Sequence, residues 1–228
     1  MKAIFPILLY VISLNVFGQS FVSLNFIPMW QGNTVSADSV FSIGNSGDSL
    51  RISTLRFYVY NIQCESENRI VWSSGDEHFL IDVFEKDGTG ILTKVPTKST
   101  VDHLSFTIGV DSTLQTTGAH SGELAPIQGM YWSWQSGYIN WKLETEIIHA
   151  GQSNAIQWHV GGYRAPYQTQ RTVRLKVMDD ADSIQCGVQL DTLLRDWRVI
   201  APAEVMSPSD KAMVLSDRFK TCFQIVSH

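Results

Sequence analysis

The stretch LRISTLRFYVYNIQC, residues 50–64, decides the fold class of this 228-residue chain. It is long and rich in β-branched and aromatic residues. Such side chains are stiff and broad, and they pack well on the pleated surface of a sheet. The stretch therefore predicts a β-strand.

Other stretches on both sides of it follow the same pattern. Apolar and polar residues alternate in FVSLNFI (21–27), and further runs are HFLIDVFE (78–85), HLSFTIGV (103–110), RTVRLKVM (171–178) and SIQCGVQL (183–190). Clusters rich in turn-forming residues separate the runs, among them GNSGDS, EKDGTG and GGYRAP. Strands with this punctuation predict an all-β domain, an antiparallel β-sandwich with Greek-key-like connections or a partly closed barrel. Long amphipathic helices do not alternate with the strands, which argues against a βαβ fold.

One short helix is predicted near the C-terminus. The stretch SPSD (207–210) offers an N-cap, a proline for the first turn and an acidic residue near the positive end of the helix. We expect the helix from Pro208 to about Phe219. Ala212, Leu215 and Phe219 then share the face that lies on the sandwich.

The first 18 residues have the features of a secretory signal peptide. Lys2 precedes an apolar run at residues 3–14, which is shorter than the roughly 20 residues that a membrane-spanning helix needs. Cleavage near Gly18 leaves residues 19–228 as a single domain. No other run is apolar enough to cross a membrane, so the protein is expected to be periplasmic or secreted, without a membrane span.

Charge and cysteine content limit the partners and the redox chemistry. The formal net charge of −5 argues against nucleic acid or an anionic membrane as a partner. Cys64, Cys186 and Cys222 allow at most one internal disulfide after export. Cys186 with Cys222 is the preferred pair, because both lie in the C-terminal quarter of the chain on predicted strands. The alternative is three buried thiols that act as small hydrophobic residues.

The stretch GMYWSWQSGYINWKLE (129–144) is unusually rich in large rings, with three of the seven tryptophans of the chain. Core packing, a ligand platform and a redox-active metal site are the three explanations. Read as a strand, it places Trp132 and Trp134 on the same face. Ser136 and Gly137 then form a turn or bulge, so that the stretch is either a hairpin or one bent strand.

Four stretches together resemble the MbnP-like family of exported copper-binding proteins, related to a methanobactin-associated periplasmic protein. They are RFYVYNI (56–62), FTIGVDS (106–112), GAHSGELAPIQGMYWSWQSGYINWKLE (118–144) and IQWHVGGY (156–163). The resemblance implies a β-sandwich that holds one copper ion through histidine. In some members an oxidised tryptophan, kynurenine, lies beside the metal, and a dihaem peroxidase-like partner performs the oxidation.

Carried over residue by residue, the resemblance points to two histidine ligands and two oxidisable rings. His159 fits the histidine–glycine motif of the family, and Trp132 and Trp134 fit its W-x-W pair. His120 lies in a loop where methanotroph-type relatives often place a histidine. Many relatives carry another histidine after the first strand, where this chain has Met29, either a thioether ligand or a core residue.

Copper chemistry suits these residue types. Neutral imidazole binds both copper oxidation states, and a thioether suits Cu(I). A hydrogen-bond acceptor must then hold the other ring nitrogen of the histidine.

Other functions have less support in the sequence. Ser112 and Ser121 lie in no GxSxG motif, and no HExxH occurs, so an enzyme is not expected. The main rival is a carbohydrate- or ligand-binding sandwich in which Trp132 and Trp134 form part of a stacking surface. A structural surface protein is the third possibility. Trp132 or Trp134 close to His159 favours the metal site, whereas an outward row of rings far from histidine favours sugar binding.

Overall fold

The computed structural model describes residues 19–43, 48–85, 90–96, 101–134, 137–149, 151–177, 183–196 and 202–226. The predicted signal peptide at residues 1–18 lies outside the described residues, as does His228.

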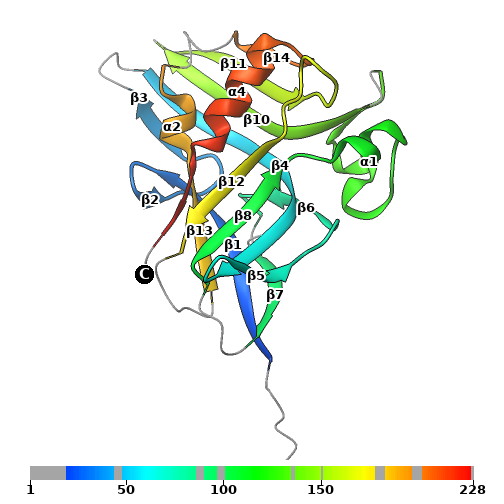
Figure 1. The fold of residues 1–228 in the computed structure, drawn as a ribbon. Helices are drawn as coiled ribbons and strands as arrows, with labels where there is room; N and C mark the ends of the chain where they lie inside the picture. Colours follow the sequence, from blue (N-terminus) through cyan, green and yellow to red (C-terminus); the bar gives the residue numbers. More distant parts are fainter. Residues whose placement is uncertain are drawn as a thin grey trace, which may run out of the picture.

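Strands make up most of the fold (Figure 1). They are β1 (Gln19–Trp30), β2 (Asn33–Thr34), β3 (Val40–Ile43), β4 (Asp48–Ser66), β5 (Arg69–Ser73), β6 (His78–Asp82), β7 (Gly90–Pro96), β8 (His103–Ile108), β9 (Tyr131–Trp132), β10 (Gly137–His149), β11 (Gln152–Gly161), β12 (Arg171–Lys176), β13 (Ser183–Gln189), β14 (Glu204–Val205) and β15 (Phe223–Ile225). The helices are α1 (Ser112–Thr116), α2 (Leu190–Leu194) and α4 (Asp210–Lys220), with 3₁₀ turns η1 (Gly122–Leu124) and η2 (Pro126–Gln128).

The strands form two sheets in the described part of the chain. The larger sheet has the order β12-β8-β4-β10-β11-β14, and the smaller has the order β15-β13-β1-β2, with β7 paired to β1. The strand predicted at residues 50–64 lies within β4, which pairs with β3, β5, β6, β8 and β10. The stretch that decides the fold class is therefore the strand around which the larger sheet is organised.

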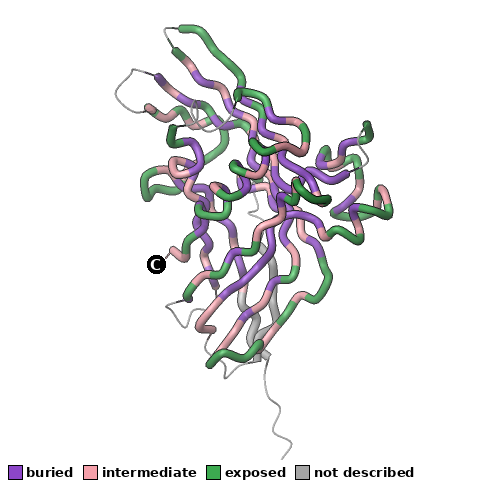
Figure 2. Tube along the Cα trace, turned by 45° about the horizontal axis from the view of Figure 1, so that its top comes forward, coloured by how far each residue is buried: buried purple, intermediate pink, exposed green. Residues whose placement is uncertain are grey.

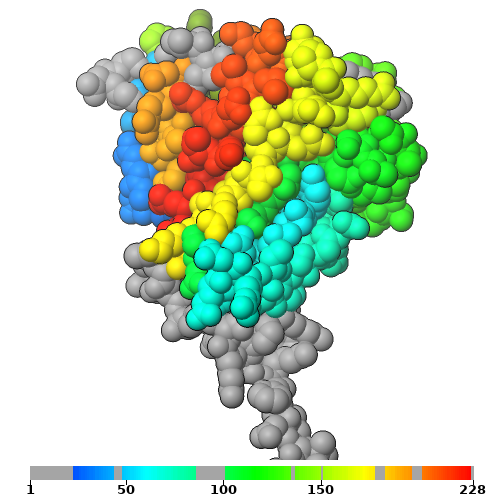
Figure 3. Space-filling model, viewed as in Figure 1, coloured from blue at the N-terminus to red at the C-terminus, as the bar shows by residue number. Residues whose placement is uncertain are grey.

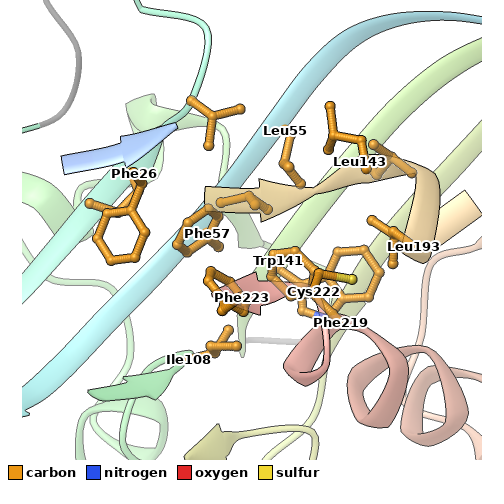
Figure 4. Packing of buried hydrophobic residues seen from close by; sticks show 14 of the residues in the cluster. Phe26, Leu55, Phe57, Ile108, Trp141, Leu143, Leu193, Phe219, Cys222 and Phe223 are labelled. Carbon is orange, nitrogen blue, oxygen red and sulfur yellow. The ribbon is translucent and has the colours of Figure 1, made fainter. Parts of the chain in front are cut away.

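Aromatic side chains from both sheets meet in the core. Phe26 of the small sheet meets Phe57 and Phe106 of the large sheet edge to face, with ring centroids 5.3 and 5.4 Å apart. Such pairs contribute about 0.5–1.5 kcal/mol beyond their burial. Figure 4 shows Phe26 and Phe57 in this core, and Figure 2 shows buried residues running through the middle of the strands. The predicted all-β sandwich-like fold is confirmed.

The predicted C-terminal helix is α4, which covers part of the inner face of the large sheet. Ser209 caps it by accepting a hydrogen bond from the backbone N–H of Ala212 at 3.2 Å. Phe219 stacks on Trp141 of β10 with ring centroids 4.6 Å apart. Ala212, Leu215 and Phe219 are all buried, as the sequence predicts. Figure 3 shows α4, in red, between the orange and yellow segments of the chain.

Two details differ from the sequence-based expectations about pairing and helix content. The sheets are mixed, because β1 runs parallel to β13 and β14 runs parallel to β11. The short helices α1 and α2 were not expected. They lack the length over which a 3.6-residue apolar period becomes visible, and tertiary contacts rather than propensity stabilise such short helices.

The preferred disulfide between Cys186 and Cys222 is wrong. All three cysteines are buried free thiols, and each belongs to the main hydrophobic cluster. Burial raises the pKa of Cys64 to about 11 and that of Cys222 to about 12. The three side chains therefore act as small apolar groups, which was the alternative interpretation.

No helix in the described part of the chain has the length and apolarity that crossing a bilayer requires.

Candidate functional site

The aromatic block forms a hairpin on the outer face of the large sheet. Trp132 and Tyr131 of β9 pair with Gly137 and Tyr138 of β10. Trp132 is 6% exposed, whereas Trp134 is 66% exposed. Their ring centroids lie 5.6 Å apart. Trp132 and Trp134 therefore form one buried and one accessible ring in contact, and not the outward row that a sugar-stacking platform needs.

The Trp132 ring lies against the backbone of Gly161 in β11. A Cβ atom at Gly161 would come within 2.8 Å of Cζ3 and 3.0 Å of Cη2 of Trp132, and within 2.5 Å of the Tyr138 carbonyl oxygen. A side chain at residue 161 is thus excluded by the ring. This explains the glycine that follows the WHV segment in the sequence.

His159 lies two residues before Gly161 on the same strand. Burial alternates along β11, with Ile156, Trp158 and Val160 in the core and His159 on the opposite face. Because side chains two residues apart share a face of a strand, His159 and the Gly161 position under Trp132 lie on the same side of the sheet. Successive residues of a strand rise by about 3.3 Å, so about 7 Å separate the two positions along β11.

A carboxylate holds one ring nitrogen of His159. Nε2 of His159 lies 3.0 Å from Oε1 of Glu144, and the histidine side chain is 14% exposed. The Nζ atom of Lys142 lies 3.1 Å from the same carboxylate oxygen. Thr54 donates a hydrogen bond of 3.1 Å to Oε2 of Glu144. All four side chains project from neighbouring strands β4, β10 and β11.

Burial and charge fix the protonation states of this pair. Burial lowers the pKa of His159, although Glu144 opposes this effect. Burial alone would raise the pKa of Glu144, but hydrogen bonds and charge from Lys142, with hydrogen bonds from His159 and Thr54, bring it below its usual value. At neutral pH the carboxylate is therefore ionised and the imidazole is neutral. Its Nε2–H donates to Glu144, which leaves the lone pair on Nδ1.

His120 lies in the loop after α1, beside the aromatic block. Its backbone N–H donates to the hydroxyl oxygen of Tyr138 at 2.8 Å. Its Nε2 atom lies 3.2 Å from the carbonyl oxygen of Leu114 and 2.9 Å from Oγ1 of Thr117. Because a carbonyl oxygen only accepts, Nε2 carries the proton here too.

Met29 lies in the smaller sheet, on β1. It is 5% exposed, and Gln189 donates a hydrogen bond of 3.3 Å to its sulfur atom. A Cβ atom at Gly187 would meet the same sulfur at 2.6 Å. The three predicted ligands therefore have three separate sets of neighbours, and Met29 fills space between β1 and β13.

The donor set around His159 fits a single imidazole anchor for copper and not a complete protein cage. In the described residues no group of three His, Cys, Asp or Glu side chains is arranged to hold a metal ion. What does fit is a neutral imidazole whose second nitrogen is held by a carboxylate, since metal-binding histidines usually have such a partner.

A network of buried hydrogen bonds connects the aromatic hairpin to neighbouring loops. The Oδ1 atom of Asn140 accepts hydrogen bonds from the Val110 backbone N–H at 3.0 Å and from Nε2 of Gln115 at 3.2 Å. Its Nδ2 atom donates to Oγ1 of Thr169 at 2.8 Å. The backbone N–H of Tyr138 donates to Oε1 of Gln115 at 2.8 Å. Thr169 in turn donates a hydrogen bond of 3.1 Å to the Gly162 carbonyl oxygen. The network therefore links the FTIGVDS, WSWQSGYIN and GGY segments, so these motifs have a structural role beside any functional one.

His78 is a buried neutral histidine at the start of β6, beside the N-terminal end of α1. Its Nδ1 atom lies 2.9 Å from the carbonyl oxygen of Asp76, and its Nε2 atom accepts from the backbone N–H of Asp111 at 3.3 Å. Burial lowers its pKa below 6.5. The tautomer with Nδ1–H satisfies both contacts, which assigns His78 a structural role.

We expect the free energy of unfolding to fall as the pH drops below 6.5, the ordinary histidine value. His78 and His159 both have lowered pKa values in the folded state, so the unfolded chain binds more protons below that pH. Their contribution is complete above pH 6.5 and is lost as the pH falls towards their folded pKa values. Urea unfolding at about pH 7.5 and about pH 5.5 measures the slope, and His78→Gln should reduce it. Equal slopes in both proteins would contradict the assignment.

The fold and the site define an all-β sandwich-like domain with an aromatic hairpin beside a carboxylate-held imidazole. The MbnP family model matches residues 19–207, and the chain therefore belongs to the MbnP family. Among solved structures, MbnP from Methylosinus trichosporium is similar with a TM-score of 0.56 and 16% sequence identity, over 77% of this chain and 78% of that chain. At this identity the likeness concerns the fold. A search of curated proteins found no match.

Sequence reasoning missed Glu144, Lys142 and Thr54 as neighbours of His159. A signal was available, because Ala150-Gly151 lies between two alternating runs and a two-residue link with glycine is a hairpin signal. Counting outward from this link pairs Lys142 with His159, the register that the structure shows.

Proposed function

We propose that this protein is an exported copper-binding protein and that Nδ1 of His159 is its anchoring ligand. The observation that supports this proposal most is the 3.0 Å contact between Nε2 of His159 and Glu144. It selects the tautomer in which Nδ1 carries the lone pair, and an imidazole in this state suits copper. Family membership adds the expectation of copper, and residues 1–18 add the expectation of export.

Each residue of the site has a separate role in this proposal. His159 binds the metal, and Glu144 orients the ring and makes it a stronger donor. Lys142 and Thr54 hold Glu144 in turn. His120 and Met29 have their own partners in other parts of the fold, so the proposal rests on His159.

Trp132 and Trp134 are the proposed oxidisable pair. The exposed ring of Trp134 is accessible to a protein partner, and Trp132 is in contact with it. The family resemblance implies a dihaem peroxidase-like partner, which we propose docks on the side of Trp134. Peptide mapping of protein from its native envelope should find any oxidised tryptophan at these two positions. Oxidation located on Trp30 instead would contradict this assignment.

Titration with Cu(I) in competition with a chelator tests the copper site. The wild-type protein should bind a single copper ion, and His159→Ala should lose this binding. His103→Ala is the matched control, because His103 lies on β8 opposite Lys176 and takes no part in the site. Equal stoichiometry and affinity in wild type and His159→Ala would overturn the proposal.

A second variant tests the role of Glu144. Glu144→Gln retains an acceptor of similar shape but removes the negative charge, and loss of such a partner typically lowers metal affinity about 10–100-fold. We expect a decrease at the lower end of this range. An unchanged copper affinity would show that Glu144 does not contribute to the site, and it would not affect the assignment of His159 as the ligand.

A further inference from the structure

A pocket of about 220 Å³ opens beside the aromatic hairpin; it shares Trp132 with the proposed oxidisable pair, but its lining includes neither His159 nor Glu144. It lies between β9, the start of β10 and the loop that follows β11. The residues that line it include the aromatic residues Trp132, Tyr138, Tyr163 and Tyr167, together with Gln115 and Arg164.

The volume of the pocket suits one six-membered ring with a substituent. A dry apolar cavity of about 150 Å³ accommodates benzene, so 220 Å³ leaves room for an additional small group. Aromatic walls favour a flat ligand, because offset or edge-to-face ring contacts add to the burial of apolar surface.

Hydrogen bonding within the protein argues against a ligand with many hydroxyl groups. Gln115 already accepts from the Tyr138 backbone and donates to Val110 and Asn140. The Tyr138 hydroxyl accepts from the His120 backbone N–H and donates to the Leu124 carbonyl oxygen. A sugar ring would therefore find no free partner at Gln115 or at the Tyr138 hydroxyl.

The charge of the pocket lining favours an anionic ligand. Arg164 is the only charged residue among the described residues that line the pocket. Its guanidinium carbon lies 5.0 Å from the centroid of the Tyr163 ring, so the side chain is partly held in place by a cation–π contact. A planar guanidinium matches a carboxylate through two parallel hydrogen bonds.

We propose that this pocket binds a small aromatic carboxylate, with its ring between the tryptophan and tyrosine walls and its carboxylate on Arg164. The proposal does not depend on copper binding, because neither His159 nor Glu144 lines the pocket.

Isothermal titration of the full mature protein with 4-hydroxybenzoate, and with the neutral 4-hydroxybenzyl alcohol, tests the proposal. The carboxylate should bind at one site and at least about tenfold more tightly than the alcohol, since a charged hydrogen bond contributes roughly 1.5–3 kcal/mol. Arg164→Gln should remove this preference. Arg174→Gln should leave it unchanged, because it removes only a surface arginine of β12 that is paired with Glu65 of β4.

A third variant locates the ligand. A Cβ atom at Gly137 would lie 3.6 Å from Gln115 and 3.7 Å from Tyr163, so Gly137→Val places its methyl groups in the pocket without a close contact at Cβ. Gly137→Val should abolish binding. If the valine variant does not fold, Gly137→Ala takes its place in the same binding measurement. Absence of carboxylate binding at millimolar concentration, equal affinity for the alcohol, or binding that survives both Gly137→Val and Arg164→Gln would each overturn the proposal.

Discussion

Asn140→Ala should lower the free energy of unfolding by about 3 kcal/mol, because a buried donor left unpaired costs about 1–3 kcal/mol and the deleted side chain leaves a void. Asn140 is fully buried. Its Oδ1 atom is the acceptor for the Val110 backbone N–H and its Nδ2 atom is a donor to Thr169. Alanine removes both contacts, whereas Gln115 keeps its bond to the Val110 carbonyl oxygen.

Chemical denaturation measures this loss directly. For a domain of this size the thermal midpoint should fall by about 6–12 °C. Asn154→Ala is the matched control, because Asn154 is exposed at the start of β11 and surface substitutions usually change stability by less than about 0.5 kcal/mol. If Asn140→Ala were as stable as Asn154→Ala, the network would not be a structural support for the hairpin.

Gly161→Ala should destabilise the fold by about 2 kcal/mol and displace the Trp132 ring, because overpacking of a dense region costs about 1–3 kcal/mol. The new Cβ atom would lie 2.5 Å from the Tyr138 carbonyl oxygen and 2.8 Å from the Trp132 ring. The backbone atom cannot rotate away. Because this clash is with the backbone of β10 and not only with the ring, the hairpin itself must shift.

Gly137→Ala is the control for this substitution, because its Cβ contacts of 3.6 and 3.7 Å are ordinary. Near-ultraviolet circular dichroism reports the packing of the tryptophan rings, and urea unfolding reports the stability. Gly161→Ala should change both, while Gly137→Ala should change neither by much. Equal spectra and equal stability in the two variants would show that Trp132 is not held against β11.

Local patterns predicted much of this fold. The β-branched and aromatic residues at 50–64 predicted β4, and the cap at Ser209 with the apolar face of Ala212 and Phe219 predicted α4. The parallel pairing of β1 with β13 could not be predicted, because the two strands lie far apart in the chain and no local signal fixes their register.

The candidate site was also predictable only in part, because some of its contacts depend on pairing between strands. His159, Trp132 and Trp134 were indicated by their motif, but the different exposure of the two tryptophans depends on the hairpin and on Gly161. Glu144 became a neighbour of His159 only through the cross-strand pairing of β10 with β11. The Cys186–Cys222 pairing failed because closeness in sequence says nothing about the direction of the two side chains.

The central claim is that Nδ1 of His159 is the atom that anchors copper. Long-range ¹H–¹⁵N spectra of histidine-labelled protein, recorded before and after addition of an equimolar amount of Cu(I), test it directly. We predict that the Nδ1 resonance of His159 shifts on loading while its Nε2 remains protonated and bound to Glu144. Unchanged His159 resonances in the loaded protein, or a shift confined to its Nε2, would contradict the claim.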